Sequence, residues 1–156
     1  MDKTDFTLIK ELQKNARAPL KTLANNVFLS SPATAARIER LESDGIIEGY
    51  SAKINHKKLG FPIMAFINVG IHPQDKPTFY PFIQSHPNVL ECYCVTGNYS
   101  MILKVMFEST EALDSFINQI QVFGNTQTQI VFSTAKCETS VDIEKINEGE
   151  YPSVQD

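Results

Sequence analysis

Arginine and lysine side chains concentrate in the first part of this 156-residue chain. Residues 1–60 hold ten Lys and Arg against seven Asp and Glu, a balance of +3, whereas residues 61–156 hold four Lys against eleven acidic residues, a balance of −7. All three arginines, Arg17, Arg37 and Arg40, lie in the first part. Guanidinium groups bind phosphates and make bidentate contacts with guanine. The first part therefore suits a polyanionic partner, although a basic solvated surface would give the same count.

Three short helices are expected to position these cations. The spacing of apolar residues predicts helices over residues 2–15, 20–27 and 31–44. Ser31 is the expected cap of the third helix, and Gly45 the residue that closes it. Two helices joined by a three-residue turn form a helix-turn-helix unit, whose second helix enters a groove of DNA.

The third helix is expected to present a small, smooth outward face. Its inner face is predicted to consist of Thr34, Ile38 and Leu41. Its outward face is predicted to consist of Ala33, Ala36, Arg40 and Ser43. Only Arg40 could make a bidentate base contact, so DNA shape should carry much of the preference. The candidate DNA-contacting residues are Arg17, Lys21, Ser31, Pro32, Ala33, Ala36, Arg37, Arg40, Lys53 and Lys57. The alternative is that the three helices pack only as an interaction module.

The second part is predicted to be a mixed α+β domain. The expected strands span residues 63–71, 89–96, 99–107 and 127–134. The expected helices span residues 76–86 and 110–123. This order is βαββαβ, the ferredoxin-like arrangement, with Gly97-Asn98 as a hairpin turn. The first strand is almost entirely apolar, which predicts burial on both of its faces.

Four segments follow from these elements. Residues 1–54 form a (winged) helix-turn-helix domain that ends in a short strand over residues 46–54. A polar, basic linker spans residues 55–62, the ferredoxin-like domain spans 63–138, and an acidic tail spans 139–156. One face of the sheet is left without helices. Its apolar residues, among them Met64, Phe66 and Tyr93, must be hidden from water, which self-association would achieve.

No residue pattern indicates an enzyme, a metal or a cofactor. The three cysteines, Cys92, Cys94 and Cys137, are an odd number, and Cys92-x-Cys94 is interpreted as a pair of small buried residues. No phosphate loop, zinc motif or nucleophile triad is present in the sequence. No apolar run is long enough to cross a bilayer, and no signal sequence precedes the first helix, so a cytoplasmic location is expected.

The helix-turn-helix segment resembles that of the leucine-responsive/asparagine-operon (Lrp/AsnC) regulators, also called feast/famine regulators. The matching residues are Leu29-Ser30, Arg37-Ile38, Leu41-Glu42 and Gly45-Ile46-Ile47. The segment from Asp5 to Arg17 is similar to the first helix of the family, and the resemblance extends over nearly the whole chain. The sequence departs from the family pattern at Pro19 and Thr22, at Phe28, where a turn glycine is common, and at Thr34.

The resemblance implies a DNA-binding transcriptional regulator that forms dimers through its sheet faces and larger rings, often octamers, from the dimers. It also implies a site for a small ligand, usually an amino acid, between dimers. The residues that it places at this effector site are Thr96, Gly97, Asn98, Tyr99, Ser100, Thr126 and Thr128. Ser100 stands where the family often has an aspartate, which removes a charged partner for an ammonium group. The effector is therefore an amino acid, another small metabolite, or absent.

Two other functions fit the same architecture. The first is an architectural protein of the chromosome that wraps DNA without sensing a ligand, which the smooth outward face and Ser100 both favour. The second is an enzyme similar to the tetrapyrrole decarboxylases, which share the two-part organisation. Such an enzyme must hold many carboxylates, but the only cations after residue 60 are Lys76, Lys104, Lys136 and Lys145.

Overall fold

The computed structural model describes residues 1–137 and 141, so nearly all of the predicted tail over 139–156 lies outside the described residues. The chain divides into two compact units, one comprising Met1–Lys53 with Lys136 and Cys137, the other comprising Ile54–Ala135. In the described part of the chain, no helix has the length and apolar character that a membrane crossing requires.

The first unit is built from three helices, α1 (Lys3–Lys14), α2 (Leu20–Asn26) and α3 (Ser31–Ser43). Its core consists of Leu8, Leu23, Ala24, Thr34 and Leu41, all of them buried. A capping box starts α1, because the Asp2 side chain accepts from the backbone N–H of Asp5, and the Asp5 side chain accepts from that of Asp2, each at 2.9 Å. The three predicted helices are confirmed, with bounds that differ by at most one residue.

The start of α3 corrects one prediction. The N-cap is Ser30 rather than Ser31, since the Ser30 hydroxyl accepts from the N–H of Ala33 at 3.3 Å. Either serine has the chemistry of a cap, and Ser30 has the extended backbone that a cap requires. The predicted end is confirmed. Gly45 adopts a φ of +70°, and its N–H donates to the carbonyl of Glu42.

The prediction of a strand over residues 46–54 is wrong, because the structure has no strand in this segment. A strand needs a neighbour, and the described residues offer this segment no backbone partner in a ladder. The segment instead lines a groove of about 720 Å³ with Ile9 and Leu12 of α1. The predicted linker also contains a short helical turn, η1 (His56–Leu59), which Gly60 ends in the left-handed conformation.

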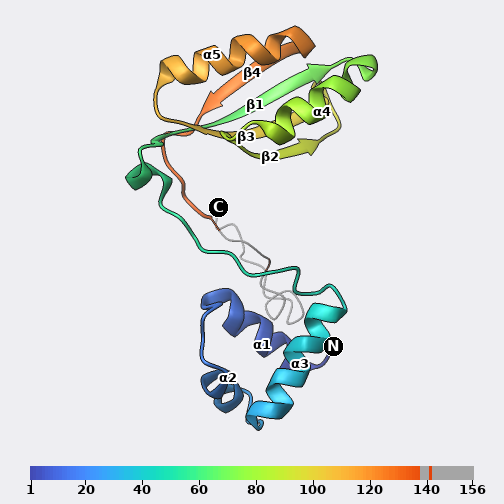
Figure 1. The fold of residues 1–156 in the computed structure, drawn as a ribbon, viewed down its shortest axis with the longest axis vertical. Coiled ribbons are helices and arrows are strands. Elements are labelled where there is room, and N and C mark those ends of the chain that lie inside the picture. Colours follow the sequence, from blue (N-terminus) through green and yellow to red (C-terminus); the bar gives the residue numbers. More distant parts are fainter. Residues whose placement is uncertain (138–140, 142–156) are drawn as a thin grey trace, which may run out of the picture. The chain divides into compact units, whose positions relative to one another are not determined.

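The second unit is a four-stranded antiparallel sheet covered by two helices, as the sequence predicts. The strands are β1 (Ile63–Ile71), β2 (Val89–Cys94), β3 (Met101–Phe107) and β4 (Gly124–Ile130), in the order β2-β3-β1-β4. The helices are α4 (Lys76–Ser85) and α5 (Thr110–Ile120), which lie along the strands in Figure 1. The core lies between sheet and helices and includes Ile67, Leu103, Phe79 and Phe116.

Only one face of β1 is fully buried, which corrects the prediction of burial on both faces. Its residues alternate between buried and half-buried from Met64 onward, because α4 and α5 cover a single face of the sheet. The open face carries half-buried Met64, Phe66 and Ile102, with Tyr93 half-exposed at its edge. An ion pair of 2.8 Å between Lys104 and Glu91 lies among them.

Glycine fixes the start of β4, three residues earlier than predicted. The predicted helix over 110–123 ends at Ile120 and continues as a short turn, η3 (Gln121–Phe123). Gly124 then pairs with Ile71 so closely that a Cβ atom on Gly124 would lie 1.9 Å from the carbonyl oxygen of Gly70. A side chain could not fit there, so the glycine allows the two strands to meet at this point.

Candidate nucleic-acid interface and ligand groove

The outward face of α3 has the composition that the helical projection predicts. Thr34 and Leu41 are fully buried, and Ile38 is half-buried. The exposed residues of the helix include the predicted Ala33, Ala36, Arg40 and Ser43 together with Pro32; Ser31 is half-buried in the first turn, and Glu39 and Glu42 are exposed beside them. The exposed face therefore combines small side chains with a guanidinium towards its C-terminal end, and the carboxylate of Glu39 lies at its edge. A surface of this shape permits close approach to a groove of DNA.

A buried carboxylate in α1 holds both arginines of α3. Asp5 is only 1% exposed, and its two oxygens accept from Arg37 Nη1 at 2.8 Å and from Arg40 Nη2 at 2.7 Å. Arg37 Nη1 also lies 2.7 Å from Asp2 Oδ2. This Asp5 network, consisting of Asp2, Asp5, Arg37 and Arg40, joins α1 to α3 through charge-assisted hydrogen bonds.

The charges of this network reinforce one another. Burial alone would raise the pKa of Asp5, but the N–H of Asp2 and the guanidinium of Arg37 donate to its carboxylate, and the charge of Arg40 lies beside it, so its pKa is held below the ordinary value. Hydrogen bonds to Asp2 and Asp5 raise the pKa of Arg37 in turn. The pairing of Asp5 with these arginines was not predicted, because they lie more than 30 residues away and no local pattern links them.

Arg40 is the arginine best placed to reach a ligand. Its side chain is 51% exposed, against 28% for Arg37. One terminal nitrogen, Nη2, is bound to Asp5, and among the described residues no partner is seen for its Nε and Nη1. The bond from Nη2 to Asp5 thus holds the guanidinium in place and leaves its other donors available to a ligand. A side chain oriented in advance loses less conformational entropy when it binds.

The other candidate cations are exposed, but they do not all lie in one unit. Arg17 follows α1 and Lys21 lies in the first turn of α2, both in the first unit. Lys53 is the last residue of that unit before the division, while Lys57 lies in η1 of the second unit. Phosphate contacts require exposed cations of this kind, which give affinity without reading sequence.

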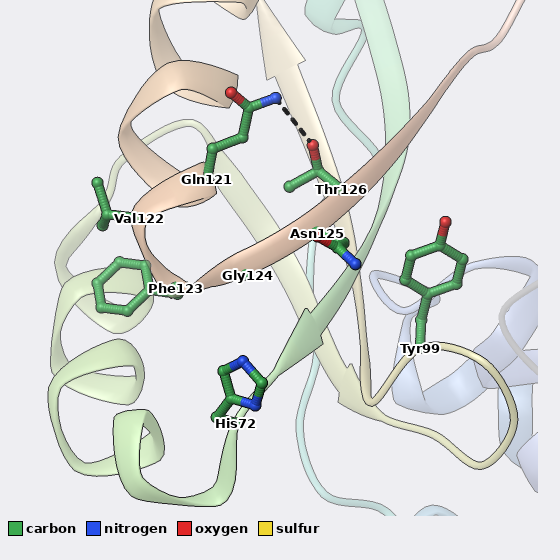
Figure 2. A pocket seen from close by; sticks show the side chains of 8 residues that line it. All are labelled: His72, Tyr99, Gln121, Val122, Phe123, Gly124, Asn125 and Thr126. Carbon is green, nitrogen blue, oxygen red and sulfur yellow. Dashed lines mark hydrogen bonds between the residues drawn. The ribbon is translucent and has the colours of Figure 1, made fainter.

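The second unit contains a groove of about 710 Å³ at the end of β1. Figure 2 shows its lining: His72 after β1, Tyr99 before β3, and the run from Gln121 to Thr126 at the start of β4. Gln121 Nε2 donates to Thr126 Oγ1 at 3.3 Å. The lining offers an imidazole, a phenol, two amides and a hydroxyl, but no carboxylate, lysine or arginine. Such a groove suits a small polar ligand.

Two of the seven predicted effector residues, Tyr99 and Thr126, line this groove. The hairpin residues Thr96, Gly97 and Asn98 are exposed outside it, and Thr128 lies opposite Ile67 on the helix-covered face. Ser100 has a structural partner, because its hydroxyl accepts from the N–H of Ile71 at 2.9 Å and ties the start of β3 to β1. The groove residues His72, Gln121 and Asn125 were not predicted; the pairing of β1 with β4 brings the end of β1 beside the start of β4, where they lie.

The cysteines are free thiols in the structure, and one of them corrects the sequence interpretation. Cys92 is half-buried, which together with the nearby Cys94 raises its pKa, but Cys94 is exposed rather than buried. Cys94 is the last residue of β2, a strand at the edge of the sheet. The described residues contain no group of three or more His, Cys, Asp or Glu that could hold a metal.

Comparisons with known proteins match both units. Residues 64–141 match the model of the Lrp/AsnC ligand binding domain, and residues 1–48 match a winged helix-turn-helix DNA-binding model. The chain is 35% identical to the HTH-type transcriptional regulator LrpC of Bacillus subtilis, over 85% of this chain and 92% of the relative. It is 39% identical to the uncharacterized HTH-type transcriptional regulator YezC of the same organism, over 88% and 97%.

Solved structures show the same architecture. The structure of B. subtilis LrpC superimposes with a TM-score of 0.84 at 33% identity, over 88% of this chain and 99% of that one. A complex of the transcriptional regulator NMB0573 with L-Met, from Neisseria meningitidis, superimposes with a TM-score of 0.88 at 26% identity, over 94% and 99%.

Proposed function

The chain belongs to the Lrp/AsnC family of DNA-binding transcriptional regulators, and on that premise we propose that α3 enters the major groove of duplex DNA. The observation that carries this proposal is the exposed face of Ala33, Ala36 and Arg40, which combines small side chains with one oriented guanidinium. Ser31, Pro32 and Arg37 complete this surface. Arg17, Lys21, Lys53 and Lys57 supply phosphate contacts, and DNA deformability supplies much of the sequence preference.

A charge introduced on this face tests the docking. Ala36→Glu places a carboxylate on the exposed face of α3, where it would be repelled by phosphates, and glutamate is a good helix former. We expect affinity for a duplex oligonucleotide to fall at least tenfold by fluorescence anisotropy. Gln119→Glu, an exposed change of the same kind on α5, is the matched control and should bind as the parent does. Equal binding by both variants would place the DNA elsewhere.

The open face of the sheet supports a proposal of self-association. Met64, Phe66 and Ile102 lie on this face only half-buried, and burying them against a second copy would remove apolar surface from water. We therefore propose a homodimer formed through this face, from which larger rings up to an octamer assemble. Gel filtration with light scattering measures the molecular mass directly, and a monomer at micromolar concentration would contradict the proposal.

The groove at the end of β1 is the proposed effector site, with Tyr99, Gln121 and Thr126 as its polar contacts. A relative in a solved structure is described in complex with L-Met, so an amino acid is the first class to test. A thermal-shift screen of the twenty amino acids would detect such a ligand, because binding to the folded state alone raises its melting temperature. A Thr126→Val variant that loses the shift would place the ligand in this groove.

One observation favours the alternative of an architectural DNA-wrapping protein without an effector. The groove lining includes no carboxylate to pair with an ammonium group, and the hydroxyl of Ser100 is already bonded to β1. A blank thermal-shift screen, combined with compaction of long DNA by the protein alone, would support that alternative. In either case we propose that the protein binds DNA in the cytoplasm without catalysing a reaction.

A further inference from the structure

Phe28, in the turn between α2 and α3, combines two unfavourable features. Its backbone has a φ of +55°, in the left-handed region, and Phe28 is the only residue other than glycine with a positive φ in the described part of the chain. Its side chain is 93% exposed. A left-handed backbone is costly for a residue with a Cβ, and an exposed aromatic ring gains nothing from burial.

The fold requires the left-handed turn but not the phenylalanine. The N–H of Leu29 donates to the carbonyl of Ala24 at 3.0 Å, and the N–H of Phe28 donates to that of Asn25. These two bonds close the C-terminus of α2 in a Schellman motif, in which the residue after the cap is left-handed and glycine is favoured. The Phe28 ring has no stacking partner among the described residues. A strained residue that the fold does not need points to a function.

Phe28 lies close to the N-terminal end of α3, the end proposed to read DNA. Ser30, the N-cap of α3, is two residues away, so the two Cα atoms are separated by at most about 7 Å. In a helix-turn-helix protein the N-terminal residues of the second helix contact the base edges. An exposed ring whose Cα lies this close to that end is within range of the same stretch of groove.

We propose that Phe28 is a specificity-determining residue of DNA recognition, whose ring contacts the 5-methyl group of a thymine in the major groove, beside the N-terminus of α3. This inference rests on the proposed function. The ring has no polar atom, and the 5-methyl group is the apolar group that base edges present in the major groove. The outward face of α3 offers few groups that read bases, so a contact from the turn adds discrimination that α3 lacks.

The test uses a duplex that the parent protein selects from a random library. It is compared with a set of duplexes in each of which a single thymine is replaced by uracil, which lacks the methyl group. We expect the parent to lose about fourfold in affinity on one uracil duplex, the factor that corresponds to one buried methyl group. Phe28→Gly should bind the selected duplex and that uracil duplex with equal affinity, and it should bind the selected duplex more weakly than the parent does. The salt dependence of its affinity should be unchanged, because no phosphate contact is lost. Phe28→Tyr keeps the ring and should restore the preference for thymine.

Thermal unfolding without DNA distinguishes this role from a structural one. Phe28→Gly should melt at a higher temperature than the parent, because glycine relieves the left-handed backbone. Phe132→Gly, the same change at another fully exposed ring, which lacks a positive φ, should not raise the melting temperature or alter DNA affinity. A destabilised Phe28→Gly, or a change in its oligomeric mass, would overturn the inference by showing that the ring packs within the protein.

The two proposals fail in different ways. If the parent selects no duplex and binds none at low ionic strength, the proposed function fails. If the parent binds and selects DNA but Phe28→Gly and the uracil duplexes change nothing, only the assignment of Phe28 fails.

Discussion

Asp5, buried near the start of α1, binds the exposed guanidinium of Arg40 on α3 at 2.7 Å. The same arginine therefore completes the packing of the first unit and faces the proposed DNA surface. An aspartate buried without a cation would be costly, and Arg37 supplies a second one at 2.8 Å. We therefore expect one carboxylate to couple stability to DNA binding, and a variant of Arg40 has to be measured for both.

Replacing Arg40 is expected to lower both stability and discrimination. Arg40→Ala should reduce the free energy of unfolding by about 1 kcal/mol, because one bond to Asp5 is lost while Arg37 keeps the other. It should also reduce the ratio of affinities for selected and random duplexes, which Arg40→Lys should not fully restore. Urea unfolding measures the first effect and anisotropy the second. An unchanged ratio would remove Arg40 from the base-reading surface.

Acid should destabilise the first unit through the same network. The pKa of Asp5 is lower in the folded chain than its ordinary value of 3.8, so its contribution to stability is complete above that value and is lost as pH falls through the folded pKa. Melting temperatures measured from pH 6 to pH 2.5 should therefore fall most steeply below about pH 4. The melting temperature of Asp5→Asn should fall less steeply over this acidic range. A fall as steep as the parent's would show that other carboxylates control the acid sensitivity.

The sequence predicts most of the elements, because each has a local signal. The apolar periodicity of α1 and the almost entirely apolar sequence of β1 locate those elements to within one residue. The strand expected over residues 46–54 fails for a physical reason. Its composition favours a strand, but a strand forms only where a neighbour supplies hydrogen bonds, and composition does not say whether one exists.

The candidate sites were predicted less completely, because their geometry depends on contacts between distant residues. The outward face of α3 follows from helical periodicity alone, whereas the hold of Asp5 on Arg40 spans 35 residues. The groove likewise depends on the pairing of β1 with β4, which brings His72 near Asn125. Helix faces were therefore predicted correctly, and pairs across the fold were not.

Lys57 tests the phosphate-contact assignment. Lys57→Ala removes an exposed charge from η1, so affinity should fall by a similar factor on selected and random duplexes. The slope of log affinity against log salt concentration should decrease in magnitude by about one. Anisotropy titrations at four salt concentrations provide both values. A loss confined to the selected duplex would instead mean that Lys57 reads sequence.

A charge on the open sheet face should break the proposed dimer. Phe66 lies on β1 opposite Lys104 of β3, so Phe66→Arg places a second cation beside an existing one in the surface that would be buried. Light scattering after gel filtration should give a molecular mass that is half that of the parent assembly or less. Gln84→Arg, an exposed change on α4, is the control and should leave the mass unaltered. A Phe66→Arg protein that keeps the parent mass would place the interface elsewhere.

Gly124 tests whether the close approach of β1 and β4 maintains the groove at the end of β1. A Cβ atom in Gly124→Ala would lie 1.9 Å from the carbonyl oxygen of Gly70, so β4 would have to move, at a cost of about 3 kcal/mol in the free energy of unfolding. Gly97→Ala is the matched control, because Gly97 also has a positive φ, +115°, but nothing lies within 4 Å of the position that a Cβ atom would take there. Denaturant unfolding should therefore show a clearly larger loss for Gly124→Ala, together with loss of any ligand-induced thermal shift. Equal losses of stability in the two variants would mean that backbone strain, rather than contact with β1, is the reason that glycine is needed at position 124.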